Sequence, residues 1–380
     1  MEVVEIPKLY IGKGTIKSLK DLKGKSILVV TDKIVQSLDF YGKILKYLKK
    51  TSMNIGEFNE VEPDPSDIII EKGLQIAKNI NPEWFIAIGG GSSIDTAKAI
   101  QFSYETGEDI KKIDAFKKYS FKSKLIAIPT TSGTGSESSA ACVITDTSKE
   151  KKITCINSVL TPYMAILDPK IPSLMPKSLT LSTALDALVH SFESLLSNLT
   201  NEFSIALSIH SINLILYNLP DVLNDLENVD LREKIHIAAL MAGIAMTKAG
   251  LGLCHGIGHS LGAVFHIPHG LAVGISLPYV LEYSKIQIKE KLNNALKLIN
   301  IPPKDFDSFI SYLKGFFKTI NAPLILKEFE ISKEDLDKNL STLIDLTMTD
   351  TMTIVNPRSV SREHVEKILL YMYDGKSIDF

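Results

Sequence analysis

Arginine, cysteine and tryptophan are scarce in this 380-residue chain, and neither sign of charge is in strong excess. Three of its 42 basic residues are arginines, and the formal net charge is −2. Such a chain lacks the electrostatic footprint of a nucleic-acid-binding protein, so we expect no nucleic-acid partner. The three cysteines (Cys142, Cys155 and Cys254) have no spacing typical of a disulfide framework, which indicates a reducing compartment.

Signals for secretion or membrane insertion are also missing from the sequence. The N-terminal stretch MEVVEIPKLY has neither the basic region nor the apolar core of a signal peptide. No apolar run is long enough to suggest a span across a bilayer. We therefore expect a cytoplasmic protein with no membrane partner. The chain is long for one hydrophobic core, so two domains are expected.

Residues 1–176 alternate short apolar runs with helical patterns, which predicts an α/β domain built on a mostly parallel sheet. In such sheets ligands bind beyond the carboxyl ends of the strands. From residue 177 onward the pattern is almost wholly helical, which predicts an all-α domain over 177–380. The segments behind the α/β prediction are a strand at 26–32, a strand at 54–61, a helix at 67–80, a strand–turn–helix unit at 84–100, a strand and loop at 124–136 and a hairpin at 141–156.

Histidine is concentrated in one short stretch, since four of the eight histidines fall within residues 253–270. A fifth, His190, comes four residues after Asp186, and residues four apart on a helix share one face. Three imidazoles and one carboxylate suit Fe²⁺, Zn²⁺ or a related divalent metal. Scattered histidines can instead cap helices or fill gaps in a core. The candidate metal ligands are Asp186, His190, His255 and His269.

Two further histidines lie in the same stretch. His259 comes one helical turn after His255, where it could shuttle a proton or orient a ligand. His266 has no role that the sequence assigns.

A glycine turn follows the strand at 84–89 and opens a helix. Backbone N–H groups at such a turn favour an anionic group such as a pyrophosphate, and the absence of Cβ atoms lets the ligand come close. The alternative is a tight structural turn without a ligand. The residues concerned are Gly89, Gly90, Gly91, Ser92 and Ser93.

Two other features suggest a bound dinucleotide. Asp32 ends the first strong strand, where a carboxylate could accept hydrogen bonds from an adenosine ribose and repel a 2′-phosphate, which favours NAD over NADP. Asp32 could equally be the N-cap of the next helix. Residues 130–136, TTSGTGS, form a second loop rich in donors that could hold the nicotinamide side.

These motifs resemble the iron-containing (metal-dependent) alcohol dehydrogenase family, which includes lactaldehyde/propanediol oxidoreductases and butanol dehydrogenases. Their order and spacing agree with that family over most of the chain. The matching segments are GGGSSIDTAKAI (89–100), IPTTSGTGSE (128–137), DALVHSFE (186–193), LCHGIGHSLGAVFHIPHG (253–270) and NPR (356–358).

The resemblance implies the dehydroquinate-synthase-like fold of that family, with an active site in a cleft between the two domains. It implies the same four metal ligands, catalytic roles for His259 and Lys152, and a homodimer or larger homo-oligomer. The cofactor-binding residues that it implies are Asp32, Gly89, Gly90, Gly91, Ser92, Ser93, Asp95, Thr130, Thr131, Thr134 and Lys152.

The function expected from these features is NAD(P)-linked oxidation of a primary alcohol or small diol, or the reverse reduction of an aldehyde. One alternative is a relative of the same fold, either a glycerol-type dehydrogenase or a sugar-phosphate lyase, although a lyase would need basic residues that the low arginine content disfavours. An alternative of another class is a non-redox metal hydrolase whose glycine loops bind no nucleotide.

Overall fold

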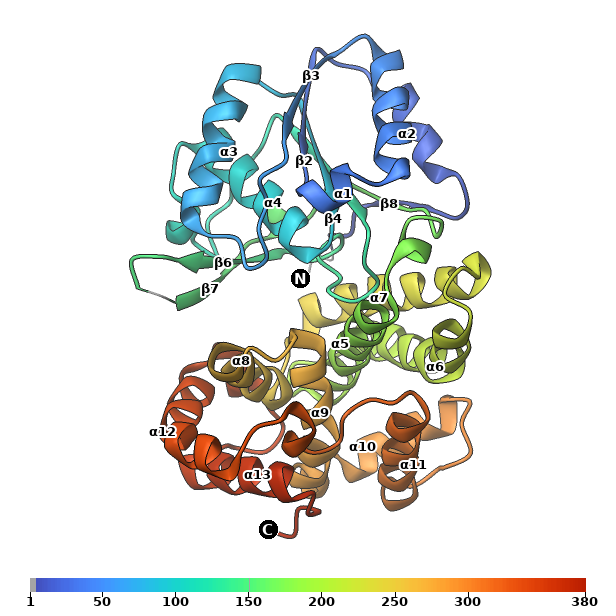
Figure 1. The fold of residues 1–380 in the computed structure, drawn as a ribbon, viewed down its shortest axis with the longest axis vertical. Coiled ribbons are helices and arrows are strands. Elements are labelled where there is room, and N and C mark those ends of the chain that lie inside the picture. The colour runs from blue at the N-terminus through green and yellow to red at the C-terminus, as the bar shows by residue number, and fades with distance from the viewer. Residues whose placement is uncertain (1–4, 150) are drawn as a thin grey trace. The chain divides into compact units, whose positions relative to one another are not determined.

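The computed structural model describes residues 5–149 and 151–380, and the chain divides into two compact units that meet at Met175 and Pro176. Figure 1 shows strands flanked by helices in the first unit and helices in the second. The predicted α/β class of the first part and helical class of the second are therefore confirmed.

The first unit contains all the strands found in the described residues. They are β1 (Lys8–Ile11), β2 (Ser26–Val30), β3 (Asn54–Phe58), β4 (Trp84–Gly89), β5 (Lys124–Pro129), β6 (Ala141–Asp146), β7 (Lys151–Ile156) and β8 (Met164–Leu167). The helices of this unit are α1 (Lys33–Gln36), α2 (Asp39–Leu48), α3 (Asp67–Ile80) and α4 (Gly91–Thr106).

The second unit consists of helices joined by short loops. They are α5 (Lys177–Leu196), α6 (Glu202–Asn224), α7 (Val229–Ala249), α8 (Leu253–Phe265), α9 (His269–Tyr283), α10 (Lys285–Leu298), α11 (Phe306–Thr319), α12 (Lys333–Thr349) and α13 (Arg362–Asp374).

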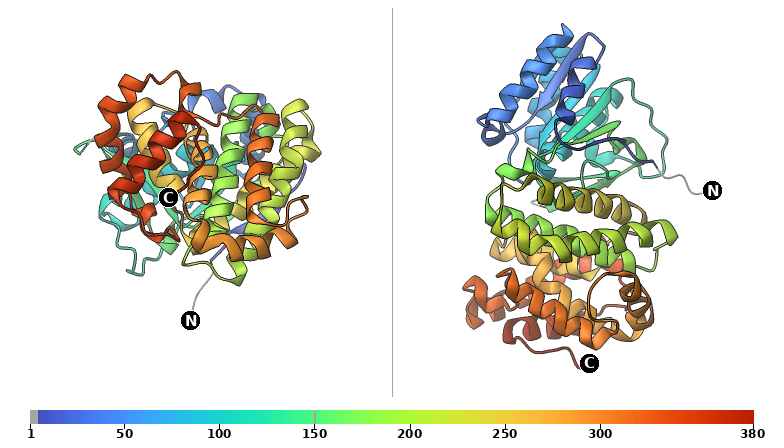
Figure 2. Two further views of the ribbon diagram at one scale, coloured as in Figure 1. Left: turned by 90° about the horizontal axis from the view of Figure 1, so that it is seen from below. Right: turned by 90° about the vertical axis from the view of Figure 1, so that its right-hand side faces the viewer.

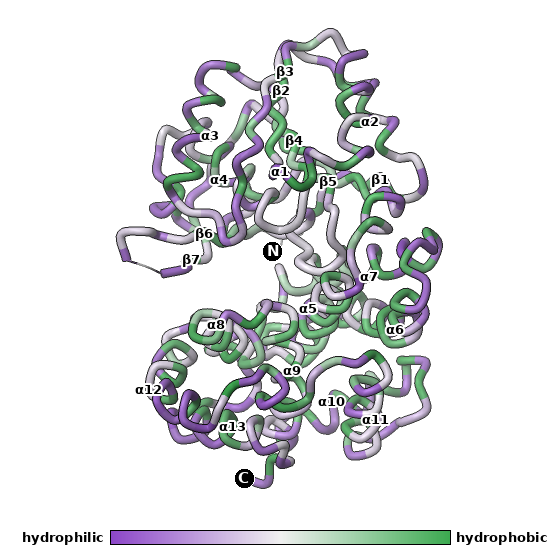
Figure 3. Tube along the Cα trace, viewed as in Figure 1, coloured by the Kyte–Doolittle hydropathy of each residue, from purple (hydrophilic) through white to green (hydrophobic). Residues whose placement is uncertain are grey.

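The main sheet is parallel throughout, with strand order β1-β8-β5-β4-β2-β3. Successive side chains of a strand point to opposite faces, and both faces are covered. Leu28 and Val30 of β2 pack in the core that contains residues of α3 and α4, whereas Ile27 and Val29 pack in the core that contains residues of α2. Figure 3 shows the resulting apolar runs along β2 and β4. Burial on both faces explains why these strands read as continuous apolar runs.

Local sequence patterns located most elements of the first unit. The helix expected at 67–80 is α3, and the hairpin expected at 141–156 is the antiparallel pair β6–β7. Two helices follow β2, because α1 ends at Gln36 and α2 begins at Asp39. β1 and β8 were missed. Each has four residues, too few for a periodic pattern, and their pairing joins segments more than 150 residues apart.

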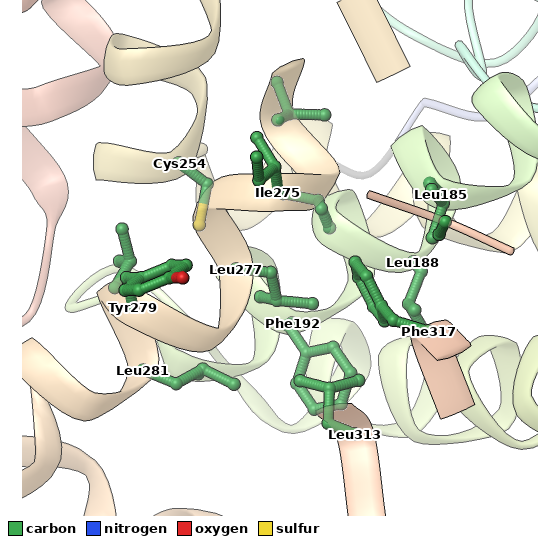
Figure 4. Close-up of a cluster of buried hydrophobic side chains, with 14 of the residues drawn as sticks. Leu185, Leu188, Phe192, Cys254, Ile275, Leu277, Tyr279, Leu281, Leu313 and Phe317 are labelled. Atoms are coloured by element: carbon green, nitrogen blue, oxygen red, sulfur yellow. The ribbon is translucent and has the colours of Figure 1, made fainter. Parts of the chain in front are cut away.

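The core of the second unit forms around α5, which packs against α6, α7 and α9. Figure 2 shows α5, α6 and α7, coloured green to yellow, running side by side. Figure 4 shows Leu188 and Phe192 of α5 meeting Leu277 of α9 and Leu313 and Phe317 of α11. Burying such a side chain contributes roughly 1.5–3 kcal/mol, so this core stabilises the helices that carry the candidate ligands.

The sequence suggested that no apolar run is long enough to span a bilayer, and this expectation is wrong for α6. By length and composition alone, α6 is long and apolar enough to cross a bilayer, and the bent pair α7 and α8 passes the same criterion together. Of the α6 stretch, 44% is buried, and α6 packs on α5 and α7. The core helix of a soluble protein meets the same criterion, so the finding is weak support for a membrane span.

Candidate functional site

The four candidate metal ligands meet within the second unit. Asp186 and His190 lie one turn apart on α5, His255 lies on α8, and His269 begins α9. Asp186 Oδ1 is 3.3 Å from Nε2 of His190, 3.6 Å from Nε2 of His255 and 3.4 Å from Nε2 of His269. The ligand atoms of Asp186, His255 and His269 all lie within 4.8 Å of one another, and His190 lies beside this group.

The polar atoms at the centre of this cluster suit a cation. Asp186 Oδ1 and His255 Nε2 are buried and have no hydrogen-bond partner among the residues that the structure describes. Leaving buried polar atoms unpaired costs about 1–3 kcal/mol each. A divalent metal would satisfy the carboxylate oxygen and the imidazole nitrogens together, so these residues fit a metal of the Fe²⁺ or Zn²⁺ type.

The charges in the cluster support the same assignment. Burial disfavours the carboxylate of Asp186, but His190 and His269 outweigh it and hold the pKa of Asp186 well below its ordinary value. Burial lowers the pKa of His190 to about 4, which keeps this imidazole neutral. An ionised carboxylate and a neutral imidazole are the forms that bind a metal.

His255 differs from His190 because a second carboxylate, that of Glu193, contacts it. Glu193 Oε2 is 2.5 Å from His255 Nδ1. Burial would lower the pKa of His255, but Glu193 and then Asp186 outweigh it and raise that pKa to about 9. Glu193 had no assigned role in the sequence, although it lies three residues after His190 and seven after Asp186. That spacing could have placed it on the same face of α5.

His259 lies beside the cluster, on the face of α8 that also carries His255. Its ring stacks on that of His269 at a centroid distance of 5.3 Å. Its Nδ1 is 2.7 Å from Oδ2 of Asp350, which follows α12. Burial lowers the pKa of His259, although Asp350 opposes this effect. No local pattern could have identified Asp350, because it lies 91 residues away in the chain.

His266 is separate from this arrangement. It is the exposed C-cap of α8 and has a left-handed backbone with φ of 55°. Its N–H donates to the carbonyl of Gly262, which closes the last turn of α8. His266 therefore ends a helix and turns the chain towards His269.

The glycine turn of the first unit lies against the donor-rich loop. Gly90 is the N-cap of α4, and a Cβ at Gly90 would lie 3.3 Å from Thr131. A Cβ at Gly91 would lie 2.9 Å from Thr134, and one at Gly89 would clash with Ser93 at 2.2 Å. Side chains are thus excluded where the backbone of the turn meets the loop. The N–H of Ser93 donates to the carbonyl of Gly90 at 3.1 Å, whereas the N–H groups of Gly91 and Ser92 precede the first helical bonds and are available to an anionic ligand.

Asp95 and Lys98 of α4 form hydrogen bonds with the donor-rich loop and with the segment that follows it. Asp95 is partly buried and accepts hydrogen bonds from Ser136 Oγ at 2.5 Å and from the N–H of Val143 at 2.9 Å. Lys98 Nζ, which is buried, donates to the carbonyls of Ser139 and Ala141 at 2.9 and 2.7 Å. Asp95, expected to bind the cofactor, therefore has both oxygens bound to the protein. The sequence had not assigned a role to Lys98.

Asp32 and Lys152 occupy other parts of the first unit. Asp32 is the N-cap of α1 and accepts a hydrogen bond from the N–H of Val35 at 2.8 Å through Oδ1. This is the capping role left open by the sequence. Its Oδ2 has no hydrogen-bond partner among the described residues and lies near Gly89. Lys152, on β7, forms an exposed ion pair with Asp64 at 2.6 Å.

Comparison with known proteins identifies the family. The iron-containing alcohol dehydrogenase model matches residues 7–169, and the C-terminal model of the Fe-containing alcohol dehydrogenase family matches residues 180–373. The chain belongs to the iron-containing alcohol dehydrogenase family. The two matches together span nearly the whole chain, including the glycine turn and the histidine cluster, and make the protein an oxidoreductase.

Two relatives in this iron-containing alcohol dehydrogenase family are similar along nearly their full length. The chain is 35% identical to the NADPH-dependent butanol dehydrogenase of Clostridium saccharobutylicum, over 98% of each protein. It is 30% identical to the NAD-dependent methanol dehydrogenase of Bacillus methanolicus, over 96% of this chain and 97% of the relative. A crystal structure of a 1,3-propanediol oxidoreductase has a TM-score of 0.91 at 26% identity, over 98% of this chain and 100% of that one.

Proposed function

We propose that the protein is a metal-dependent, NAD(P)-linked dehydrogenase that oxidises a primary alcohol or small diol, or reduces the corresponding aldehyde. The observation that carries this proposal is the buried cluster around Asp186 Oδ1, in a chain that also has a glycine turn at the start of α4. Relatives named for butanol, methanol and 1,3-propanediol support the substrate class.

The proposed metal ligands are Asp186, His190, His255 and His269, with Fe²⁺ or Zn²⁺ as the metal. When bound, the metal would supply Lewis-acid polarisation of a substrate oxygen. The chain contributes an ionised carboxylate, the buried imidazoles of His190 and His255, and the more exposed imidazole of His269. Asp186 holds the negative charge at the centre of the cluster, with imidazole nitrogens from three different helices turned towards it.

We assign movement of the substrate proton to His259. Ionised Asp350 accepts a hydrogen bond from Nδ1 of His259, since a carboxylate has no proton to donate. Nε2 of His259 is then unprotonated and free to accept the alcohol proton. The nicotinamide, when bound, would accept the hydride from the carbinol carbon.

The proposed cofactor-binding residues divide into direct and supporting ones. The turn at Gly89–Gly91 with Ser92 and Ser93 would hold the pyrophosphate on the N-terminus of α4, and Thr130, Thr131 and Thr134 would lie on the nicotinamide side. Asp95 supports the loop rather than touching the ligand. We retain Lys152 as a weaker candidate because its charge is already paired with Asp64.

The choice between NAD and NADP depends on Asp32. Its free Oδ2 would repel a 2′-phosphate, which supports NAD. The relative from Clostridium saccharobutylicum is named for NADPH, so family membership does not decide the choice. The cytoplasmic location, the homo-oligomeric state and the division into domains at residue 176 stay predictions.

The test is a turnover assay on metal-free protein reloaded anaerobically with Fe²⁺ or Zn²⁺. NADH and NADPH formation is followed with short alcohols and 1,2-diols. We expect metal-dependent reduction of the cofactor, and we expect His269→Ala to lose both metal retention and turnover while the exposed His210→Ala keeps both. Absence of both turnover and NADH binding with every metal would reject the dehydrogenase and favour the non-redox hydrolase.

A further inference from the structure

Glu193 is a buried carboxylate directly behind the proposed metal ligands. It shares one face of α5 with Asp186 and His190, since these residues are spaced by four and three positions. Glu193 is 8% exposed, so the charge of its carboxylate is largely removed from water. An isolated buried charge is costly, and this carboxylate must therefore be fully paired by hydrogen-bond donors.

Two donors from the start of α8 meet the two oxygens of Glu193. The N–H of Cys254 donates to Oε1 at 2.7 Å, and His255 Nδ1 lies 2.5 Å from Oε2. An ionised carboxylate can only accept, so the proton must be on His255 Nδ1. The other ring nitrogen, Nε2, is buried and faces Asp186 Oδ1 at 3.6 Å, and it is a bare acceptor in the neutral ring, which is the form that would bind a metal.

We propose that Glu193 is the positioning residue of the metal centre: it fixes the ring orientation of His255 and the tautomer in which Nε2 can bind a metal. This inference rests on the proposed function, because it assigns Glu193 a role only through the ligand His255. Carboxylates in this position also raise the basicity of a ligating imidazole, and their loss commonly costs 10- to 100-fold in metal affinity.

The backbone of Gly252 lies close against the carboxylate of Glu193. A Cβ at Gly252, just before α8, would lie 3.0 Å from Glu193 Oε1 and 3.2 Å from Asn356 Oδ1. Asn356 itself accepts a hydrogen bond from the N–H of Leu253 at 3.3 Å. The start of α8, and with it His255, is therefore held by side chains from α5 and from residue 356.

The substitution Glu193→Gln separates positioning from simple helix capping. A glutamine side chain has one oxygen and one NH₂ group, so it cannot accept from both Cys254 N–H and His255 Nδ1–H. If the oxygen keeps the Cys254 bond, the NH₂ group faces His255 Nδ1 and favours the tautomer with the proton on Nε2. That tautomer cannot bind a metal through Nε2.

Glu282→Gln is the matched control. Glu282, on α9, is also a poorly exposed carboxylate in the second unit. It accepts from Lys314 Nζ at 2.7 Å and from the N–H of Ile378 at 2.9 Å, and the described contacts of its side chain involve no proposed ligand. Loss of its charge therefore tests the general effect of removing a buried carboxylate from this unit.

The experiment is a chelator-competition titration of Zn²⁺ into metal-free wild type, Glu193→Gln and Glu282→Gln. Circular dichroism and NADH binding are measured on the same samples. We expect Glu193→Gln to bind Zn²⁺ about 10- to 100-fold more weakly than wild type with NADH binding unchanged, and Glu282→Gln to bind within about threefold. Wild-type Zn²⁺ affinity in Glu193→Gln would overturn the inference, as would an equal loss in Glu282→Gln.

A second variant keeps the inference testable if Glu193→Gln is poorly folded. Gly252→Ala retains the carboxylate but pushes against its Oε1, so we expect a smaller loss of Zn²⁺ affinity. Unchanged affinity in Gly252→Ala, where Glu193→Gln cannot be measured, would overturn the proposal. If the wild type itself binds no Zn²⁺, the proposed metal centre fails, and that result is distinct from failure of the role of Glu193.

Discussion

Two histidines of α8 each have one ring nitrogen paired with a carboxylate, and this pairing decides what the other nitrogen can do. Glu193 contacts Nδ1 of His255, and Asp350 contacts Nδ1 of His259. A carboxylate thus contacts Nδ1 of both a proposed metal ligand and a proposed proton acceptor. The two histidines differ in exposure: the side chain of His255 is 2% exposed and that of His259 is 33% exposed, as a group that meets substrate requires.

Asp350→Asn tests the role of His259 without removing a helix cap. Asp350 Oδ1 accepts from the N–H of Met352, a bond that asparagine also makes. The amide NH₂ group would face His259 Nδ1 and favour a proton on Nε2, so we expect kcat to fall about 10- to 100-fold with Zn²⁺ content unchanged. Steady-state kinetics and metal analysis measure this, with Asp305→Asn, which replaces the exposed cap of α11, as the control. Full activity in Asp350→Asn would remove Asp350 from the mechanism.

Asp32→Ser separates charge from capping in cofactor choice. Serine also caps helices, so the bond to the N–H of Val35 can be replaced while the negative charge is lost. We expect the ratio of kcat/KM for NADP to that for NAD to rise about 10-fold or more, because the 2′-phosphate is no longer repelled. If the ratio does not change, Asp32 acts only as the cap of α1.

At the scale of elements, α4 links the glycine turn to the loop after β5 in the first unit. Its first residues form the turn, and one turn further on Asp95 and Lys98 anchor the loop after β5 and the start of β6. Glu137 is buried in the same loop, where burial raises its pKa to about 7 although Lys98 opposes the shift. Burial therefore disfavours the charged form of this carboxyl group in the interior of the first unit.

This raised pKa predicts a pH-dependent loss of stability. The folded-state pKa of Glu137 is about 7 and its ordinary value is 4.5, so the proton it binds stabilises the fold fully below pH 4.5. That stabilisation, about 3 kcal/mol, is lost as the pH rises through about 7. Glu137→Gln should therefore match wild type near pH 4.5 and exceed it in free energy of unfolding at pH 8. Chemical denaturation at both pH values measures the difference, and a constant difference would contradict the assignment.

At the scale of the whole molecule, each unit has its own hydrophobic core. The proposed metal-binding residues are in one unit and the proposed cofactor-binding residues are in the other. The metal ligands come from α5, α8 and α9 in the second unit, whereas the glycine turn and its supporting loop are in the first. Binding of the metal would therefore stabilise the second unit, and binding of the dinucleotide would stabilise the first.

Metal removal should consequently affect one unit more than the other. Zn²⁺ at 100 times its dissociation constant contributes about 2.7 kcal/mol of stability. In a unit of about 200 residues this corresponds to a rise of roughly 5–10 °C in the unfolding temperature. We expect calorimetry to show that chelation lowers the transition of residues 176–380, while NADH raises that of the first unit. Equal shifts of both transitions on chelation would contradict independent sites.

Local chemistry along the chain determined much of the fold and the choice of candidate residues. Alternating apolar runs predicted the parallel sheet because its strands are buried on both faces, and the i, i+4 spacing predicted that Asp186 and His190 share a helix face. The glycine turn was predictable because a strand followed by glycines and a helix leaves unpaired N–H groups.

Only the tertiary structure decided which groups pair across the chain. β1 joins β8, Glu193 meets His255 and Asp350 meets His259 through contacts 62 to more than 150 residues apart. Lys98 and Asp95 likewise reach a loop about 40 residues away. Such pairings depend on how helices and strands pack, and side-chain periodicity within one element carries no information about them.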